Sequence, residues 1–135
     1  MCEYFTRSVS FFQNDFSFVA RQYKITISGI NYYADLVFYN RFLRCFVVIE
    51  LKLGRLKPEH LGQLHFYVRY FDEKEKTSDE NDTIGILVCE EKDNAVVKIA
   101  LPKGNETIFA VEYLKYLPDE KELQKKINHE IRKNK

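Results

Sequence analysis

Residues 45–52 constrain the fold of this chain more than any other segment. Five apolar residues in succession, Cys45-Phe46-Val47-Val48-Ile49, are followed directly by Glu50-Leu51-Lys52. Side chains alternate between the two faces of a strand, so an unbroken apolar run predicts a strand that is covered on both faces. We therefore expect residues 44–53 to form the central strand of a sheet with packed layers on either side.

The two segments before this strand also have the composition of strands. Residues 24–28 alternate polar and apolar, and residues 31–39 are rich in aromatic and β-branched side chains. Gly29 lies between them and predicts a turn, while residues 40–43 predict the hairpin connection to the central strand. Three successive strands are therefore expected.

Three segments have apolar residues at the spacing of a helix. They are residues 3–12, residues 119–132, and a stretch from Pro58 to about Phe71 whose proline suits a first helical turn. Residues 83–89 and 107–111 predict strands, residues 93–100 fit a helix or a strand, and residues 72–82 predict a solvated loop. The order is helix, three strands, helix, strand, then a strand and a helix, which predicts an α/β domain with a mixed sheet.

Length and composition indicate one ordinary globular domain over residues 1–135. The sequence is 45% apolar and 15% aromatic, unlike a disordered chain, and no apolar run reaches the roughly 20 residues that span a bilayer. Cys2, Cys45 and Cys89 form no close pair, and the last two lie in apolar runs that predict buried thiols and a reducing cytoplasm. The net charge of +1 decides nothing about nucleic acid, because the distribution of charge matters more.

Three charged residues interrupt strands that are otherwise apolar: Asp35, Glu50 and Lys52. Buried charges are rare unless they are paired or bind a metal. Glu50 and Lys52 share a face, and a hairpin that pairs Tyr39 with Arg44 would place Asp35 opposite Val48, on that same face. Asp35 and Glu50 are then expected as diagonal neighbours, roughly 7–8 Å apart at Cα.

Two carboxylates that converge in this way can hold a hard cation. Mg²⁺ accepts oxygen ligands and keeps waters and phosphate oxygens in its coordination sphere, and Lys52 is placed to orient a water or balance charge on a phosphate. The alternative is a structural ion pair between Glu50 and Lys52, with Asp35 capping a turn. Zinc is not indicated, because His65 and His129 have no partner at ligand spacing.

The pattern Asp35 … Glu50-Leu51-Lys52 resembles the signature of the PD-(D/E)XK nuclease superfamily, whose core order is helix, three strands, helix, strand. Further blocks resemble the YhcG-type nuclease domain over roughly residues 16–117. These blocks are residues 16–22 (FSFVARQ), 35–39 (DLVFY), 43–45 (LRC), 49–54 (IELKLG), 57–59 (KPE) and 62–63 (GQ).

The resemblance implies a restriction-endonuclease-like core and a metal-dependent nuclease that uses Mg²⁺ or Mn²⁺. Asp35 and Glu50 would be metal ligands, with the Leu51 carbonyl as a third, Lys52 the catalytic lysine, and Gln63 a further site residue. Ala34 stands where the superfamily name has proline, and Glu3 is the candidate for an acid that many members carry on the first helix. Relatives of this type have an additional N-terminal domain, so the chain can be part of a longer protein.

Several side chains are candidates for contact with DNA. Each is also compatible with an ordinary surface role, and the basic residues of segment 119–132 are interspersed with acids, which favours a solvated helix. The candidates are Arg21, Gln22, Arg41, Arg44, His60 and Tyr67.

Two functions follow from these observations. The first is a Mg²⁺-dependent DNA endonuclease with Asp35, Glu50, Lys52 and Gln63 at its active site, acting on duplex or branched DNA. A homodimer is compatible with this function, because two strands are cut. The alternative is a DNA-binding or assembly module that retains the nuclease fold without catalysis.

Overall fold

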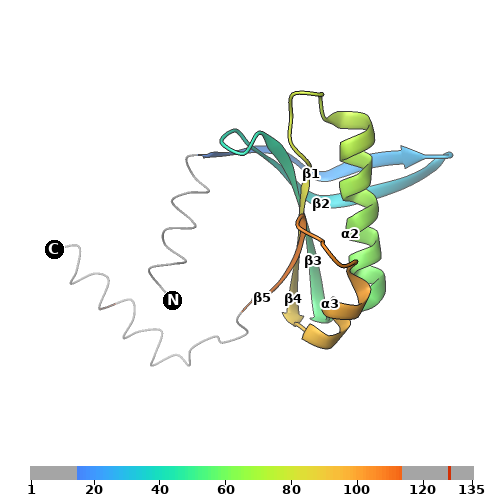
Figure 1. The fold of residues 1–135 in the computed structure, drawn as a ribbon, viewed down its shortest axis with the longest axis vertical. Helices are drawn as coiled ribbons and strands as arrows, with labels where there is room; N and C mark the ends of the chain where they lie inside the picture. Colours follow the sequence, from blue (N-terminus) through green and yellow to red (C-terminus); the bar gives the residue numbers. More distant parts are fainter. Residues whose placement is uncertain (1–14, 114–127, 129–135) are drawn as a thin grey trace.

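The computed structural model describes residues 15–113 and Asn128, which form a mixed five-stranded sheet and its helices (Figure 1). The strand order is β1-β2-β3-β4-β5; β1, β2 and β3 run antiparallel, and β3, β4 and β5 run parallel. The elements in chain order are β1 (Phe16–Ile27), β2 (Ile30–Asn40), β3 (Cys45–Arg55), α2 (Pro58–Tyr70) with a π-helical turn (Phe71–Glu75), β4 (Ile84–Glu91), α3 (Asn94–Ala100) and β5 (Ile108–Glu112).

The central strand predicted from the apolar run is β3. It pairs with β2 on one side and with β4 on the other, and its side chains Val47 and Val48, which point to opposite faces, are both buried. The parallel pairing of β3 with β4 requires a crossover, and α2 supplies it. The mixed α/β architecture expected from the sequence is therefore confirmed.

Helix α2 packs closely on one face of the sheet. Leu61, Leu64 and Val68 are buried against this face, and they lie at the helical spacing seen in the sequence. The closest approach is at Gly85 of β4, where an added Cβ atom would lie 2.7 Å from Val68 Cγ2. A glycine at this position therefore lets the helix lie directly on the strand.

Some predicted elements differ from those observed. β1 begins at Phe16, eight residues before the predicted strand. Residues 93–100, for which the sequence left a helix or a strand open, contain the helix α3 (Asn94–Ala100). Asp93 explains this helix, because its carboxylate accepts hydrogen bonds from the N–H groups of Ala95 and Val96, as an N-cap does. The predicted helices 3–12 and 119–132 lie outside the described residues.

The hairpin register was predicted wrongly by two residues. Tyr39 pairs with Phe46 and Asn40 pairs with Cys45, so Arg44 belongs to the turn. Arg44 adopts a left-handed conformation with φ of 51°, and the Asn40 side chain accepts a hydrogen bond from the Leu43 N–H. A shift of two residues keeps every side chain on its predicted face, because faces alternate with a period of two.

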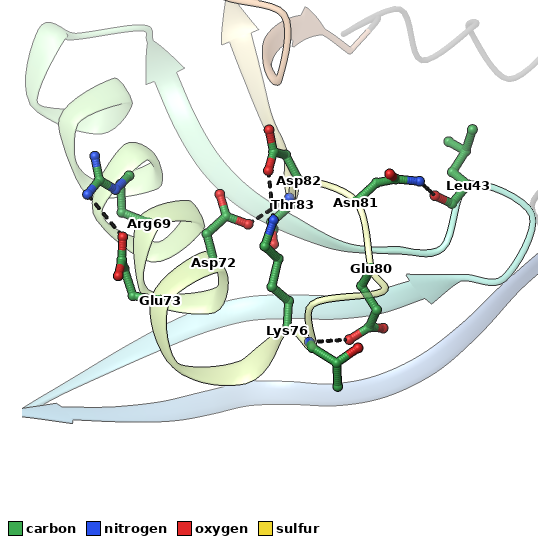
Figure 2. A network of polar contacts seen from close by, with 10 residues as sticks. Leu43, Arg69, Asp72, Glu73, Lys76, Glu80, Asn81, Asp82 and Thr83 are labelled. Atoms are coloured by element: carbon green, nitrogen blue, oxygen red, sulfur yellow. Dashed lines mark hydrogen bonds and ion pairs between the residues drawn. The ribbon is translucent and has the colours of Figure 1, made fainter.

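The segment after α2 is polar, as predicted, and it connects three elements through hydrogen bonds (Figure 2). Asp72 accepts from the N–H of Thr83 at the start of β4, and Lys76 forms an ion pair with Asp82. Asn81 donates its side-chain N–H to the Leu43 carbonyl in the β2–β3 hairpin. This segment therefore attaches the hairpin to the end of the helix.

Two further expectations concern cysteines and membranes. Cys45 and Cys89 are free thiols and are buried, as predicted, whereas Cys2 lies outside the described residues. Among the described residues, no helix is long and apolar enough to cross a membrane.

We predict that Gly85→Ala destabilises the protein by about 1–3 kcal/mol, because the new methyl group would overlap Val68 and Leu64 in a packed layer. Gly62→Ala is the matched control: this glycine is exposed in the middle of α2, and an added Cβ there would contact nothing within 4 Å. That substitution is expected to raise stability by up to about 1 kcal/mol, because alanine favours a helix. Urea unfolding of both variants gives the comparison, and equal effects would contradict the close packing of α2 on β4.

Candidate active site

The ladder between β2 and β3 ends at the pair Leu36–Ile49, and beyond it the strands are joined through two carboxylates. The Asp35 N–H donates to Glu50 Oε1 at 2.9 Å. In return, the Leu51 N–H donates to Asp35 Oδ2 at 2.8 Å. Continuation of the observed register would place Asp35 directly opposite Glu50 rather than diagonal to it, and the two hydrogen bonds bring the two segments together.

Gln22 of β1 binds the other oxygen of Asp35. Its side-chain amide donates to Asp35 Oδ1 at 3.1 Å. Gln22 has a φ of 53°, a left-handed conformation that costs a non-glycine residue roughly 1–2 kcal/mol. Both oxygens of Asp35 are thus held by hydrogen bonds, one from β1 and one from β3.

Glu50 is the most unusual charged group of the described structure, because only 1% of its surface is exposed. Lys52 Nζ lies 3.9 Å from Glu50 Oε2, and the Lys52 side chain is 26% exposed, so this lysine reaches both the carboxylate and solvent. The pKa of Glu50 is raised to about 7, with burial as the largest cause; the Asp35 charge also acts to raise this pKa, and the Asp35 N–H and Lys52 act to lower it. Burial therefore disfavours the ionised form of Glu50, and Lys52 compensates for this only in part.

Helix α2 forms the wall behind the carboxylates. Tyr67 accepts a hydrogen bond from the Gln63 amide at 3.0 Å, and burial, followed by the charge of Glu50, raises the pKa of its phenol. Tyr67 is only 1% exposed, so of the two orientations left open by the sequence it faces inward, and its contact with DNA stays a prediction. Gln63 is half-buried and reaches the site through Tyr67 rather than through a hydrogen bond to Asp35 or Glu50.

His60 lies one helical turn before Gln63, at the start of α2. Its Nδ1 accepts a hydrogen bond from the Lys57 N–H at 3.2 Å. Burial lowers the pKa of His60, and the positive charge of Lys52 lowers it further. His60 thus belongs to the edge of the site.

The candidate arginines separate into two groups. Arg21 is exposed on β1 beside Gln22 and opposite Leu36, next to the site. Arg41 and Arg44 lie in the β2–β3 turn, six residues along their strands from Asp35 and Glu50, which corresponds to about 20 Å. The structure therefore does not bring the hairpin arginines to the carboxylates.

The donor set suits a hard divalent cation. Two carboxylates meet where the strand ladder opens, the backbone of Leu51 is bound to one of them, and the buried charge of Glu50 lacks full compensation. Mg²⁺ commonly uses one or two carboxylates and completes its coordination with water and phosphate oxygens. In the described part of the chain, His, Cys, Asp and Glu form no group of three that could hold a metal, and Glu3 lies outside it.

Comparison with known proteins identifies the family. A model of the YhcG PDDEXK nuclease domain matches residues 5–128. The chain belongs to this nuclease family. It is 38% identical over 110 residues to the Escherichia coli (strain K12) protein named "Putative nuclease YhcG", a match that covers 82% of this chain and 29% of that protein. The chain therefore spans less than a third of this relative's length.

Solved structures show the same fold at low sequence identity. A repair endonuclease from Pyrococcus abyssi matches with a TM-score of 0.52 and 18% identity, covering 84% of this chain and 45% of that one. The EndoMS–dsDNA2 complex matches with a TM-score of 0.54 and 21% identity, covering 86% and 44%. The restriction-endonuclease-like fold expected from the resemblance is thereby confirmed.

One contact of the site was not expected from the sequence. Gln22 was considered for DNA, and the structure places its amide on Asp35. The signal available in the sequence was its position in the block FSFVARQ, which resembles the family outside the charged signature. The left-handed backbone at Gln22 carries no sequence signal, because it depends on the bond that the side chain makes.

We predict that Glu50 lowers the stability of the metal-free protein as pH rises. Its folded pKa of about 7 exceeds the ordinary 4.5, so the folded state retains a proton that the unfolded chain releases, and stability falls between those values. Glu50→Gln removes this effect, although the groups that face it, Asp35, Lys52 and Tyr67, remain.

The measurement is urea unfolding of both proteins in EDTA at pH 5 and pH 8. The stability of Glu50→Gln relative to the wild type is expected to increase over this interval by up to about 3 kcal/mol, at about 1.4 kcal/mol per pKa unit. A difference that does not change with pH would show that the Glu50 carboxyl titrates normally.

Proposed function

We propose that this chain is a divalent-metal-dependent DNA endonuclease domain whose active site is Asp35, Glu50 and Lys52. The observation that carries this proposal is the reciprocal pair of hydrogen bonds between the Asp35 and Glu50 segments, with Lys52 3.9 Å from Glu50. A structural ion pair would not require a second carboxylate bound against the first. Membership of the nuclease family supports the same assignment.

In this proposal Asp35 and Glu50 hold Mg²⁺ or Mn²⁺, and the Leu51 carbonyl is the third protein ligand. The ion, when bound, polarises the phosphate and lowers the pKa of a coordinated water. Gln22 is a positioning residue, because its amide fixes one oxygen of Asp35 while the Leu51 N–H fixes the other. Residues that orient metal ligands in this way typically affect metal affinity or activity by about 10- to 100-fold.

Lys52 is proposed as the catalytic lysine. Its ammonium group is partly exposed and lies beside Glu50, where it can orient the attacking water and balance negative charge on the phosphate. In hydrolysis the water oxygen bonds to phosphorus, one phosphorus–oxygen ester bond breaks, and the leaving oxygen gains a proton. The Gln63–Tyr67 pair supports the site from α2 by maintaining the wall behind Glu50.

DNA is the proposed substrate on two grounds. One structural relative, EndoMS, was solved as a complex with double-stranded DNA. The carboxylates alone would repel a phosphodiester, and the proposed cation together with Lys52 removes that repulsion.

We predict that the protein cleaves plasmid or branched DNA in Mg²⁺ or Mn²⁺ and not in EDTA. Glu50→Gln and Lys52→Ala are each expected to lower the cleavage rate on the order of 100-fold or more, because each removes a group that stabilises the transition state. Lys98→Ala is the control, since Lys98 is an exposed lysine on α3, an element that contributes no residue to the site. Agarose-gel cleavage assays with matched protein concentrations give the rates.

Metal-stimulated cleavage that persists in both active-site variants would contradict the assigned site. DNA binding without cleavage across substrates and ions would instead indicate the alternative function, a non-catalytic module with the nuclease fold.

A further inference from the structure

Positive charge is concentrated in the segment that contains the candidate site. Between Phe16 and Pro58 the only acidic residues are Asp35 and Glu50, against seven Lys or Arg, which gives a formal net charge of +5. The whole chain has a net charge of +1, so the residues outside this segment sum to −4. The near-neutral total therefore conceals a cationic segment of the chain, residues 16–58, which contains both carboxylates. The seven basic residues are Arg21, Lys24, Arg41, Arg44, Lys52, Arg55 and Lys57.

Part of this segment is a two-stranded arm, residues 23–34. Within the described structure these residues pair only with each other across β1 and β2, because the β2–β3 ladder ends at Leu36. In Figure 1 the two-stranded arm passes α2 and ends beyond it. Residues 16–34 contain no acidic residue at all.

The two faces of the arm differ in chemistry. One face packs on α2: Ile25 is fully buried, and the Tyr32 and Phe66 rings lie 5.1 Å apart. The other face, here called the outer face, holds the cross-strand pairs Lys24–Tyr33 and Thr26–Asn31, and all four residues are exposed. These four side chains carry an ammonium group, two hydroxyl groups and an amide, and none of them is a carboxylate.

The hairpin arginines have a different electrostatic environment. Asn81 ties the polar segment 72–82 to the turn through Leu43 and Arg44, and that segment contains six acids against two lysines (Figure 2). A phosphate near Arg41 or Arg44 would therefore meet a net negative surface. Arg21 and Lys24, in contrast, have no acidic partner among the described residues.

We propose that the outer face of the arm, together with Arg21 at its base, binds the phosphodiester backbone of the nucleic acid that enters the Asp35–Glu50 site. Tyr33 is two residues from Asp35 on β2, so the Cα atoms of these two residues are roughly 7 Å apart along the strand. Phosphate contacts of this kind orient a duplex without reading its sequence. The inference rests on the proposed function, because it supplies the substrate-binding surface of that same site.

The test measures binding of the full chain to a fluorescein-labelled DNA duplex by anisotropy in EDTA, over a series of salt concentrations. Loss of two phosphate contacts in the Arg21→Gln/Lys24→Gln double variant is expected to lower the slope of log affinity against log salt by about 2. Affinity at low salt is expected to fall about tenfold or more. Lys98→Gln is the matched control, and Arg41→Gln tests the hairpin; both should retain the wild-type slope.

Equal slopes for the arm variant and the Lys98→Gln control would overturn the proposal, as would a larger effect at Arg41 than at the arm. Competition by unlabelled single-stranded DNA, duplex DNA and RNA shows which of these nucleic acids the protein binds most tightly. Hydrolysis of a small phosphodiester, bis(p-nitrophenyl) phosphate, with Mn²⁺ reports the active site independently of the arm. Glu50-dependent hydrolysis of this ester by protein that does not bind nucleic acid would contradict the proposed role of the arm. It would not contradict the assigned active site.

Discussion

The reciprocal hydrogen bonds between Asp35 and the Glu50–Leu51 segment are the contact on which the rest of the site depends. They replace the backbone ladder where β2 and β3 separate, so each carboxylate fixes the position of the strand that carries the other. The separation of the strands is also what releases residues 23–34 as an arm. This interaction therefore positions both carboxylates at the point where the backbone ladder between β2 and β3 ends.

The burial of Glu50 has a thermodynamic consequence that connects stability with function. Glu50 is 1% exposed, and its carboxylate has one lysine at 3.9 Å and is held at a pKa of about 7, so its ionised form destabilises the metal-free fold. A bound cation would favour the ionised form and remove that cost. Sites that bind a charged ligand commonly retain such unfavourable electrostatics in its absence.

Sequence patterns predicted the central strand and helix α2, because both follow from hydrophobic periodicity. The common face of Asp35 and Glu50 was inferred from an assumed hairpin register and from the alternation of side chains along a strand. The hairpin register could not be predicted in the same way: periodicity fixes the face of a side chain and leaves a shift of two residues open. The turn at Arg44 and the strained backbone at Gln22 depend on contacts across strands, which no local pattern encodes. The orientation of Tyr67 could not be decided from the sequence, because a tyrosine beside an apolar stripe can turn either inward or outward.

The most direct test of the Asp35–Glu50 pair as a metal site is anomalous diffraction from crystals of the protein soaked in Mn²⁺. The expected result is one anomalous peak within coordination distance of both carboxylates, which is absent from crystals of the Asp35→Asn/Glu50→Gln double variant. An Mn²⁺ peak elsewhere, with Asp35 and Glu50 retaining only their mutual hydrogen bonds, would contradict it.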